Sequence, residues 1–138
     1  MRLELTRRGD YAVRAMLALG QHSGDDWLSV PAVSAAMAIP ERFLPRIMAD
    51  LVEAGLVQGR RGRTGGYRLA RPADVISLLD IIAAAEREPD PRKCILRGGP
   101  CRLDGRCAVH DAFTGAREAM LDRLGATTLA EVARAGLA

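Results

Sequence analysis

The chain has 138 residues, 49% of them hydrophobic, and a net charge of +3. This length suits one domain, or a small domain with an appendage, and the hydrophobic content is enough for a core. No apolar run is long enough to cross a membrane, and the first residues, MRLELTRRGDY, lack the apolar segment of a secretion signal. These features predict a cytoplasmic protein that makes no membrane contact.

The positive charge is concentrated in the first half of the chain. Residues 1–72 hold 11 arginines and 7 acidic residues, whereas residues 73–138 hold 9 basic and 10 acidic residues. All but one of the basic residues are arginine, whose planar guanidinium suits phosphate and guanine edges. This asymmetry favours nucleic-acid contacts in the first half, although ordinary surface charge would give the same balance.

The elements expected in the first half follow the order of a winged helix. Thr6 and Ser29 are positioned to cap the first two helices, and Gly55 to end the third. The expected helices are residues 7–19, 29–37 and about 41–53, and the expected strands are residues 56–58 and 66–69. A helix–turn–helix followed by a basic hairpin predicts a mainly α fold with a small β-hairpin wing.

The second half is predicted to be helical around one irregular loop. Helices are expected at residues 77–86 and 108–124 and after Thr128, which has capping-box spacing to Glu131. The long helix carries an apolar stripe that a winged helix with a closed core leaves uncovered, so we expect it to pack against its copy in a homodimer rather than fold back. We therefore divide the chain into a DNA-binding domain, residues 1–72, and dimerisation helices with a cysteine loop, residues 73–138, the loop being residues 93–107.

The third helix is the expected reading helix, because the second helix of a helix–turn–helix enters the major groove. Arg42 and Arg46 lie four residues apart, on the face opposite the apolar residues, and each could fork onto a guanine. Pro45 lacks a backbone N–H, so the helix is expected either to start late or to have an irregular first turn. Two solvated arginines are the alternative interpretation.

The turn between the strands is the second expected DNA contact. It contains Arg60, Arg61 and Arg63 among glycines that permit tight turning. An arginine at such a tip can enter a narrow minor groove, where the negative potential is strongest. A solvated charge cluster is the alternative, but the helix pair and the basic hairpin together favour DNA binding.

All three cysteines, Cys94, Cys101 and Cys107, fall in the stretch KCILRGGPCRLDGRC. Clustered thiols in a reducing compartment suggest metal or redox chemistry rather than disulfides. Zinc sites generally use closer pairs, whereas wide gaps in a glycine-rich loop suit an iron–sulfur cluster. Three thiolates leave a fourth ligand open. His110 and Asp10 are the candidates, although either could instead be an ordinary helix-terminal residue.

Several segments together resemble the IscR/NsrR/RirA family of bacterial winged-helix transcription regulators. They are TRRGDYAVRAMLALG, IPERFLPRIMADLVEAGLV, RRGRTGGYRLARP, ISLLDIIAAAE, the cysteine loop and TTLAEV. The resemblance covers nearly the whole chain and implies a homodimer that binds double-stranded operator DNA. It also implies a [2Fe-2S] or [4Fe-4S] cluster that senses iron, redox or nitric oxide status.

The resemblance assigns roles by position. It puts Arg42, Pro45 and Arg46 at positions that contact DNA bases, and Arg61 at the DNA-contacting position of the wing. The cluster thiolates are then Cys94, Cys101 and Cys107. His110 matches the histidine ligand of the IscR-like branch, and Asp10 the aspartate ligand of the NsrR-like branch. The first cysteine gap is one residue longer than in the IscR-like branch.

The function expected from the sequence is a dimeric DNA-binding repressor controlled by an iron–sulfur cluster. The first alternative keeps the DNA binding and replaces the cluster with a direct thiol switch. The second is a small redox enzyme or iron carrier. The sequence offers no phosphate loop, catalytic triad or paired carboxylates in its support, so we do not expect an enzyme.

Overall fold

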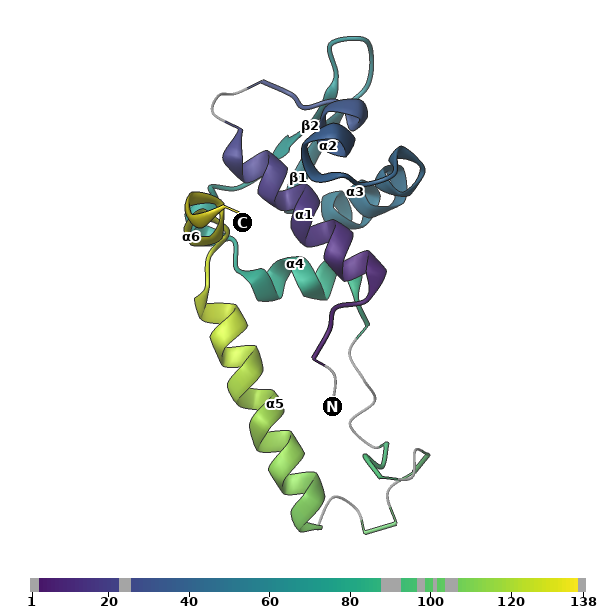
Figure 1. Ribbon diagram of the computed structural model, residues 1–138, viewed down its shortest axis with the longest axis vertical. Coiled ribbons are helices and arrows are strands. Elements are labelled where there is room, and N and C mark those ends of the chain that lie inside the picture. Colours follow the sequence, from purple (N-terminus) through teal and green to yellow (C-terminus); the bar gives the residue numbers. More distant parts are fainter. Residues whose placement is uncertain are drawn as a thin grey trace.

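The computed structural model describes residues 3–22, 26–87, 93–96, 99–100, 102–103 and 107–136. Six α-helices and one antiparallel hairpin make up the fold of these residues (Figure 1). The helices are α1 (Arg7–Gln21), α2 (Val30–Met37), α3 (Leu44–Glu53), α4 (Leu78–Ala85), α5 (Ala108–Ala126) and α6 (Leu129–Ala135). The strands are β1 (Val57–Arg60) and β2 (Gly66–Leu69), and the short 3-10 turns are η1 (Glu41–Phe43) and η2 (Ala73–Val75). The mainly α fold with a β-hairpin wing is thus confirmed.

Four of the helices begin at a hydroxyl side chain that accepts a hydrogen bond from the first helical turn. These N-caps are Thr6, Ser29, Ser77 and Thr128. At Thr128 the Glu131 carboxylate also accepts a hydrogen bond from the backbone N–H of Thr128, which completes the expected capping box. Such caps satisfy backbone donors that the helix itself cannot pair, so they fix where each helix starts.

The first turn of α1 is also held from α4. The Glu86 carboxylate, at the C-terminal end of α4, accepts a hydrogen bond of 2.5 Å from the backbone N–H of Thr6. Glycine at residue 9 leaves room for this carboxylate, because a Cβ there would lie 2.2 Å from the Glu86 Oε1 atom and would displace it. The start of α1 and the end of α4 are therefore fastened together.

The reading helix starts late, as Pro45 suggested. Glu41–Phe43 form the 3-10 turn η1, and the α-helix proper begins at Leu44, which places Pro45 in a first turn that needs no N–H donor. The helix ends at Gly55, whose φ of +77° lets the N–H groups of Gly55 and Leu56 bond back to Val52 and Leu51. Because the Leu56 N–H is used in this way, β1 begins at Val57, one residue later than expected.

A single hydrophobic core joins the two halves of the sequence. Helix α1 packs against α2 and α3 on one side and against α4 and α6 on another (Figure 1). The fully buried side chains include Met16 of α1 and Met48 of α3, together with Ile76, Ile81 and Leu129 from beyond residue 72. The expected division at residue 72 is therefore not a break in packing.

Helix α5 stands apart from this core. Figure 1 shows it extending away from the body, with residues 93–96, 99–100 and 102–103 near its far end. None of its residues is buried, and Val109, Phe113 and Met120 are each about 40% exposed. Within the described ranges no helix, α5 included, is both long and apolar enough to span a lipid bilayer.

Candidate nucleic-acid interface and cysteine loop

The outward face of η1 and α3 carries the predicted reading residues. Arg42, Pro45 and Arg46 are all exposed, whereas Ile47 and Met48 on the opposite face are buried in the core. The Arg46 side chain is 78% exposed. The three residues therefore share a solvent-facing surface, which is the arrangement that a helix needs in order to meet base edges.

Arg46 shares an acidic partner with the first helix. Its Nε atom lies 3.6 Å from the Asp50 Oδ1 atom, one turn further along α3. Arg8 of α1 forms an ion pair with the other carboxylate oxygen of Asp50. Asp50 thus lies between two guanidinium groups and biases the direction in which Arg46 extends.

Arg42 is supported by aromatic rings instead. Its guanidinium carbon lies 4.7 Å from the centre of the Phe43 ring, and the Phe43 ring centre lies 5.4 Å from that of Tyr11 on α1. A guanidinium over a ring face is held by cation–π attraction. Both reading arginines are consequently positioned by contacts that lead back to α1.

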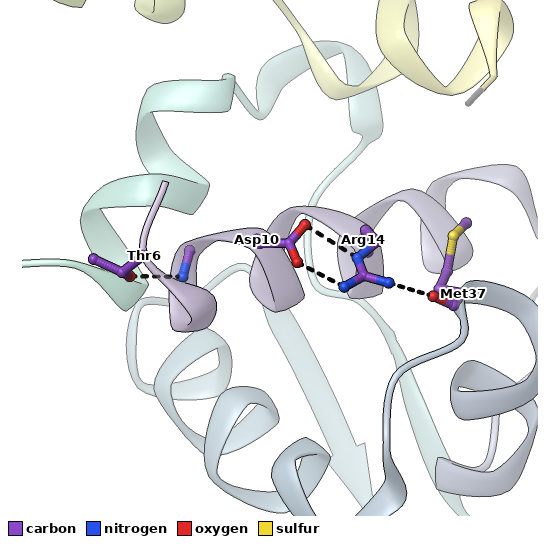
Figure 2. Close-up of polar contacts among 5 residues, drawn as sticks. Thr6, Asp10, Arg14 and Met37 are labelled. Atoms are coloured by element: carbon purple, nitrogen blue, oxygen red, sulfur yellow. Dashed lines mark hydrogen bonds and ion pairs between the residues drawn. The ribbon is translucent and has the colours of Figure 1, made fainter. Parts of the chain in front are cut away.

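The turn of the helix–turn–helix is held by a chain of polar contacts that begins at Asp10 (Figure 2). The Arg14 guanidinium donates to both Asp10 oxygens, at 3.1 and 2.6 Å, and to the Met37 carbonyl at the end of α2, at 2.7 Å. Ala38 follows in the left-handed conformation, with φ of 53°. The Asp10 carboxylate, about half exposed, therefore orients Arg14 toward the end of α2.

The wing is a tight hairpin in which the three arginines have different environments. Arg60 donates to the Thr64 carbonyl at 2.6 Å, and its guanidinium carbon lies 4.7 Å from the centre of the Trp27 ring. Arg61 and Arg63 are exposed, and neither forms an ion pair within the part of the chain that the structure describes. These two side chains are therefore available to a partner outside the chain.

The hairpin is anchored to the body through a backbone bridge. Leu28 and Tyr67 exchange two hydrogen bonds of 2.9 and 2.8 Å. Gly66, with φ of +142°, makes this approach possible, because a Cβ there would lie 2.2 Å from the Leu28 carbonyl oxygen. The loop before α2 thus extends the wing by one paired residue.

Two of the three predicted cluster thiols lie within the described residues. Cys107 is the N-cap of α5, and its Sγ atom accepts a hydrogen bond of 3.3 Å from the His110 backbone N–H. Cys94 donates its N–H to the Gly99 carbonyl at 2.8 Å, beside an isolated bridge between Lys93 and Pro100. Cys101 lies outside the described residues.

The two candidates for a fourth ligand differ in position. His110 lies in the first turn of α5, three residues after Cys107, whereas Asp10 lies on α1, away from the far end of α5 (Figure 1). Among residues with a described placement, no three metal-ligating side chains gather at one point. The candidate ligands nevertheless fit an iron–sulfur cluster, because they include thiols. One of these thiols, Cys107, lies at the positive N-terminus of α5, which suits an anionic group.

Two features near the wing were not expected from the sequence. The Nε2 atom of His22 is buried and has no hydrogen-bond partner in the described part of the chain. It lines a cavity of about 610 Å³ together with residues of β2. Trp27 lies against both Arg60 and Arg68. The cavity beside His22 and the contacts of Trp27 both bring together segments that are distant in sequence, so no local sequence pattern could reveal them.

Comparison with known proteins places this architecture in a family. Residues 5–135 match the model of the Rrf2 family, described as iron-dependent transcriptional regulators. The HTH-type transcriptional regulator IscR of Vibrio vulnificus is 35% identical over 130 residues, which are 94% of this chain and 77% of the relative.

Two solved structures share the fold over almost the whole chain. The structure of CymR, the global cysteine regulator of B. subtilis, superposes with a TM-score of 0.80 and 26% identity, covering 99% of this chain and all of the other. IscR of T. potens gives a TM-score of 0.77 and 27% identity, covering 99% and 93%. The chain therefore belongs to the Rrf2 family and is a transcriptional regulator rather than an enzyme.

Proposed function

We propose that the chain is a homodimeric, operator-binding repressor whose DNA affinity is controlled by an iron–sulfur cluster held in the Cys94–Cys107 loop. The observation that carries the proposal is the position of Cys107. Its sulfur caps α5, so whatever binds this thiol acts directly on the start of the helix with the exposed apolar face. A regulator bound to chromosomal DNA would act in the cytoplasm.

The DNA contacts are proposed for residues 1–72. Arg42 and Arg46 would read guanine edges in the major groove, with Pro45 in van der Waals contact beside them. Arg61 and Arg63 would enter the adjacent minor groove. Two observations support these DNA contacts. All five residues are exposed, and among the described residues neither Arg61 nor Arg63 has an acidic partner. Arg60, already bonded to Thr64, would contribute by ordering the wing and by its charge.

The dimer is proposed to form along α5, within residues 73–138. Val109, Phe113 and Met120 recur at helical spacing and remain about 40% exposed, so a second copy of α5 would cover the apolar area that this chain leaves in water. A twofold dimer of this kind binds an inverted repeat whose half-sites are separated by whole helical turns.

Cys94, Cys101 and Cys107 would hold the cluster, which when bound supplies a redox- and nitric-oxide-sensitive centre at the head of α5. His110 is favoured as the fourth ligand because it shares the first turn of α5 with Cys107. Asp10 remains the alternative. It would have to come from the second subunit and give up its bonds to Arg14, which would loosen the hold of Arg14 on the Met37 carbonyl.

A second candidate is a cluster-free thiol switch. Cys107 is partly exposed and caps α5, so oxidation of this thiol would act on the start of that helix. The structural similarity to CymR, the global cysteine regulator of B. subtilis, is a further reason to keep this candidate.

Anaerobic purification distinguishes the two candidates. The cluster proposal expects a coloured protein with stoichiometric iron and sulfide, and Cys107→Ser should lose both. Operators selected from genomic DNA with the anaerobic protein should bind differently before and after iron chelation. A colourless protein that takes up no iron during anaerobic reconstitution, yet changes DNA affinity on peroxide treatment, would instead establish the thiol switch.

Matched variants identify the fourth ligand. His110→Ala should alter the visible spectrum and speed cluster loss if His110 is the ligand, and Asp10→Asn should do so if Asp10 is. Because Asp10 also supports Arg14, the apo form of Asp10→Asn serves as the control for a purely structural effect on DNA binding. Unchanged spectra in both variants would exclude both residues.

A further inference from the structure

We infer that Trp27 is the positioning residue of the wing: its indole holds Arg60 and Arg68 and thereby sets the direction in which Arg61 and Arg63 reach DNA. Trp27 is the only tryptophan in the chain. Its side chain is partly buried, although it belongs to a loop that precedes α2. A large aromatic at such a position requires a partner, and the hairpin supplies it.

The register of the hairpin explains how one ring meets two arginines. Gln58 pairs with Arg68, and Arg60 lies two residues after Gln58, so all three side chains project from the same face of the hairpin. The guanidinium carbons of Arg60 and Arg68 lie 4.7 and 4.3 Å from the Trp27 ring centre. Arg68 also donates to the Gln58 side chain at 3.1 Å. The indole therefore covers this face across both strands.

The contact matters because a two-stranded hairpin has little stability of its own. The backbone bridge at Leu28 holds only β2, at Tyr67, which pairs with Gly59 next to the last pair before the turn. Arg60 stands at the end of β1, pairs across the hairpin with Gly66, and bonds to the carbonyl of Thr64 in the turn. Holding Arg60 on Trp27 consequently fixes the end of β1, immediately before Arg61, while the Leu28 bridge fixes the facing part of β2.

The cation–π contacts also explain how two arginines can lie on the same face of the hairpin. Arg60 and Arg68 carry like charges on one face of a narrow hairpin, and the electron-rich ring compensates for their proximity. Trp27 therefore keeps two cations in place while the exposed pair, Arg61 and Arg63, stays free of acidic partners in the described part of the chain.

Because this inference rests on the proposed role of the wing in DNA binding, the test separates the two. The probe is a duplex selected from genomic DNA by the wild-type protein, and the readout is its dissociation constant by fluorescence anisotropy. We expect Trp27→Ala to weaken binding about tenfold and Trp27→Phe, which keeps a ring, by less than about threefold. In an Arg61→Ala/Arg63→Ala background, Trp27→Ala should have no further effect.

The outcomes are distinct. Full affinity of the Arg61→Ala/Arg63→Ala protein would overturn the role of the wing. An unaffected Trp27→Ala protein, or an equal loss with and without the wing arginines, would overturn the role of Trp27 alone. Arg134→Ala, an exposed arginine on α6, is the control. Since Trp27 is the sole tryptophan, its emission tests the contact directly: Arg60→Ala and Arg68→Ala should shift it to longer wavelength, and Arg61→Ala should not.

Discussion

Arg46 shows how one exposed side chain acquires a defined role. Its partner Asp50 is nearly buried and shared with Arg8, so the Arg46 guanidinium starts from a restrained position. Arg46→Ala should weaken operator binding by about 1–3 kcal/mol and abolish discrimination at one base pair, because a bidentate contact to guanine is lost. Anisotropy titrations against operators with single base-pair changes measure both effects. Arg134→Ala on α6 should match wild type, and preserved discrimination in Arg46→Ala would contradict the assignment.

Arg61 should behave differently, because a wing contact in the minor groove is largely electrostatic. Arg61→Ala should weaken binding to all sequences by similar factors and lower the salt dependence of log K by about one. Titrations at several salt concentrations provide the slope. A change in base preference without a change in slope would show that Arg61 reads sequence instead.

The wing as an element depends on one glycine. Gly66→Ala should reduce the free energy of unfolding by about 1–3 kcal/mol, because φ of +142° and a contact of 2.2 Å with the Leu28 carbonyl both exclude a Cβ. Urea unfolding followed by Trp27 emission reports the loss. Gly125→Ala is the matched control, since a Cβ there would meet only Leu79 at 3.6 Å. Equal stability of the two variants would refute the steric argument.

For the whole molecule, the exposed face of α5 predicts the oligomeric state. Phe113→Glu should convert the dimer to monomers, because a charge would be buried in an apolar contact. The monomer should bind an inverted repeat at least tenfold more weakly, since its two half-site contacts are no longer linked. Light scattering after size-exclusion chromatography measures the mass, and Glu118→Lys on the same helix is the control. A dimeric Phe113→Glu protein would place the interface elsewhere.

Local chemistry decided which features could be predicted. The caps at Thr6, Ser29 and Thr128 and the late start caused by Pro45 depend on residues within one turn, so the sequence contains the whole cause. The outward face of the reading helix follows in the same way from helical periodicity.

The features that could not be predicted join distant segments. Neither the bond from Arg14 to Met37 nor the pairing of Arg8 with Asp50 has a short-range signal. Arg60 and Arg61 are alike in the sequence, and they differ in the structure because Arg60 contacts Trp27 and the Thr64 carbonyl. His22 is a similar case, because it lines a cavity together with β2, which is distant in sequence.

The way in which α5 is attached has a consequence for the whole molecule. Two hydrogen bonds, from the Leu78 N–H to the Thr127 carbonyl and from the Leu129 N–H to the Ile76 carbonyl, join the C-terminal end of α5 to the body. Any change in the direction of α5 at this junction would, in the dimer proposed along α5, change the distance between the α3 helices of the two subunits.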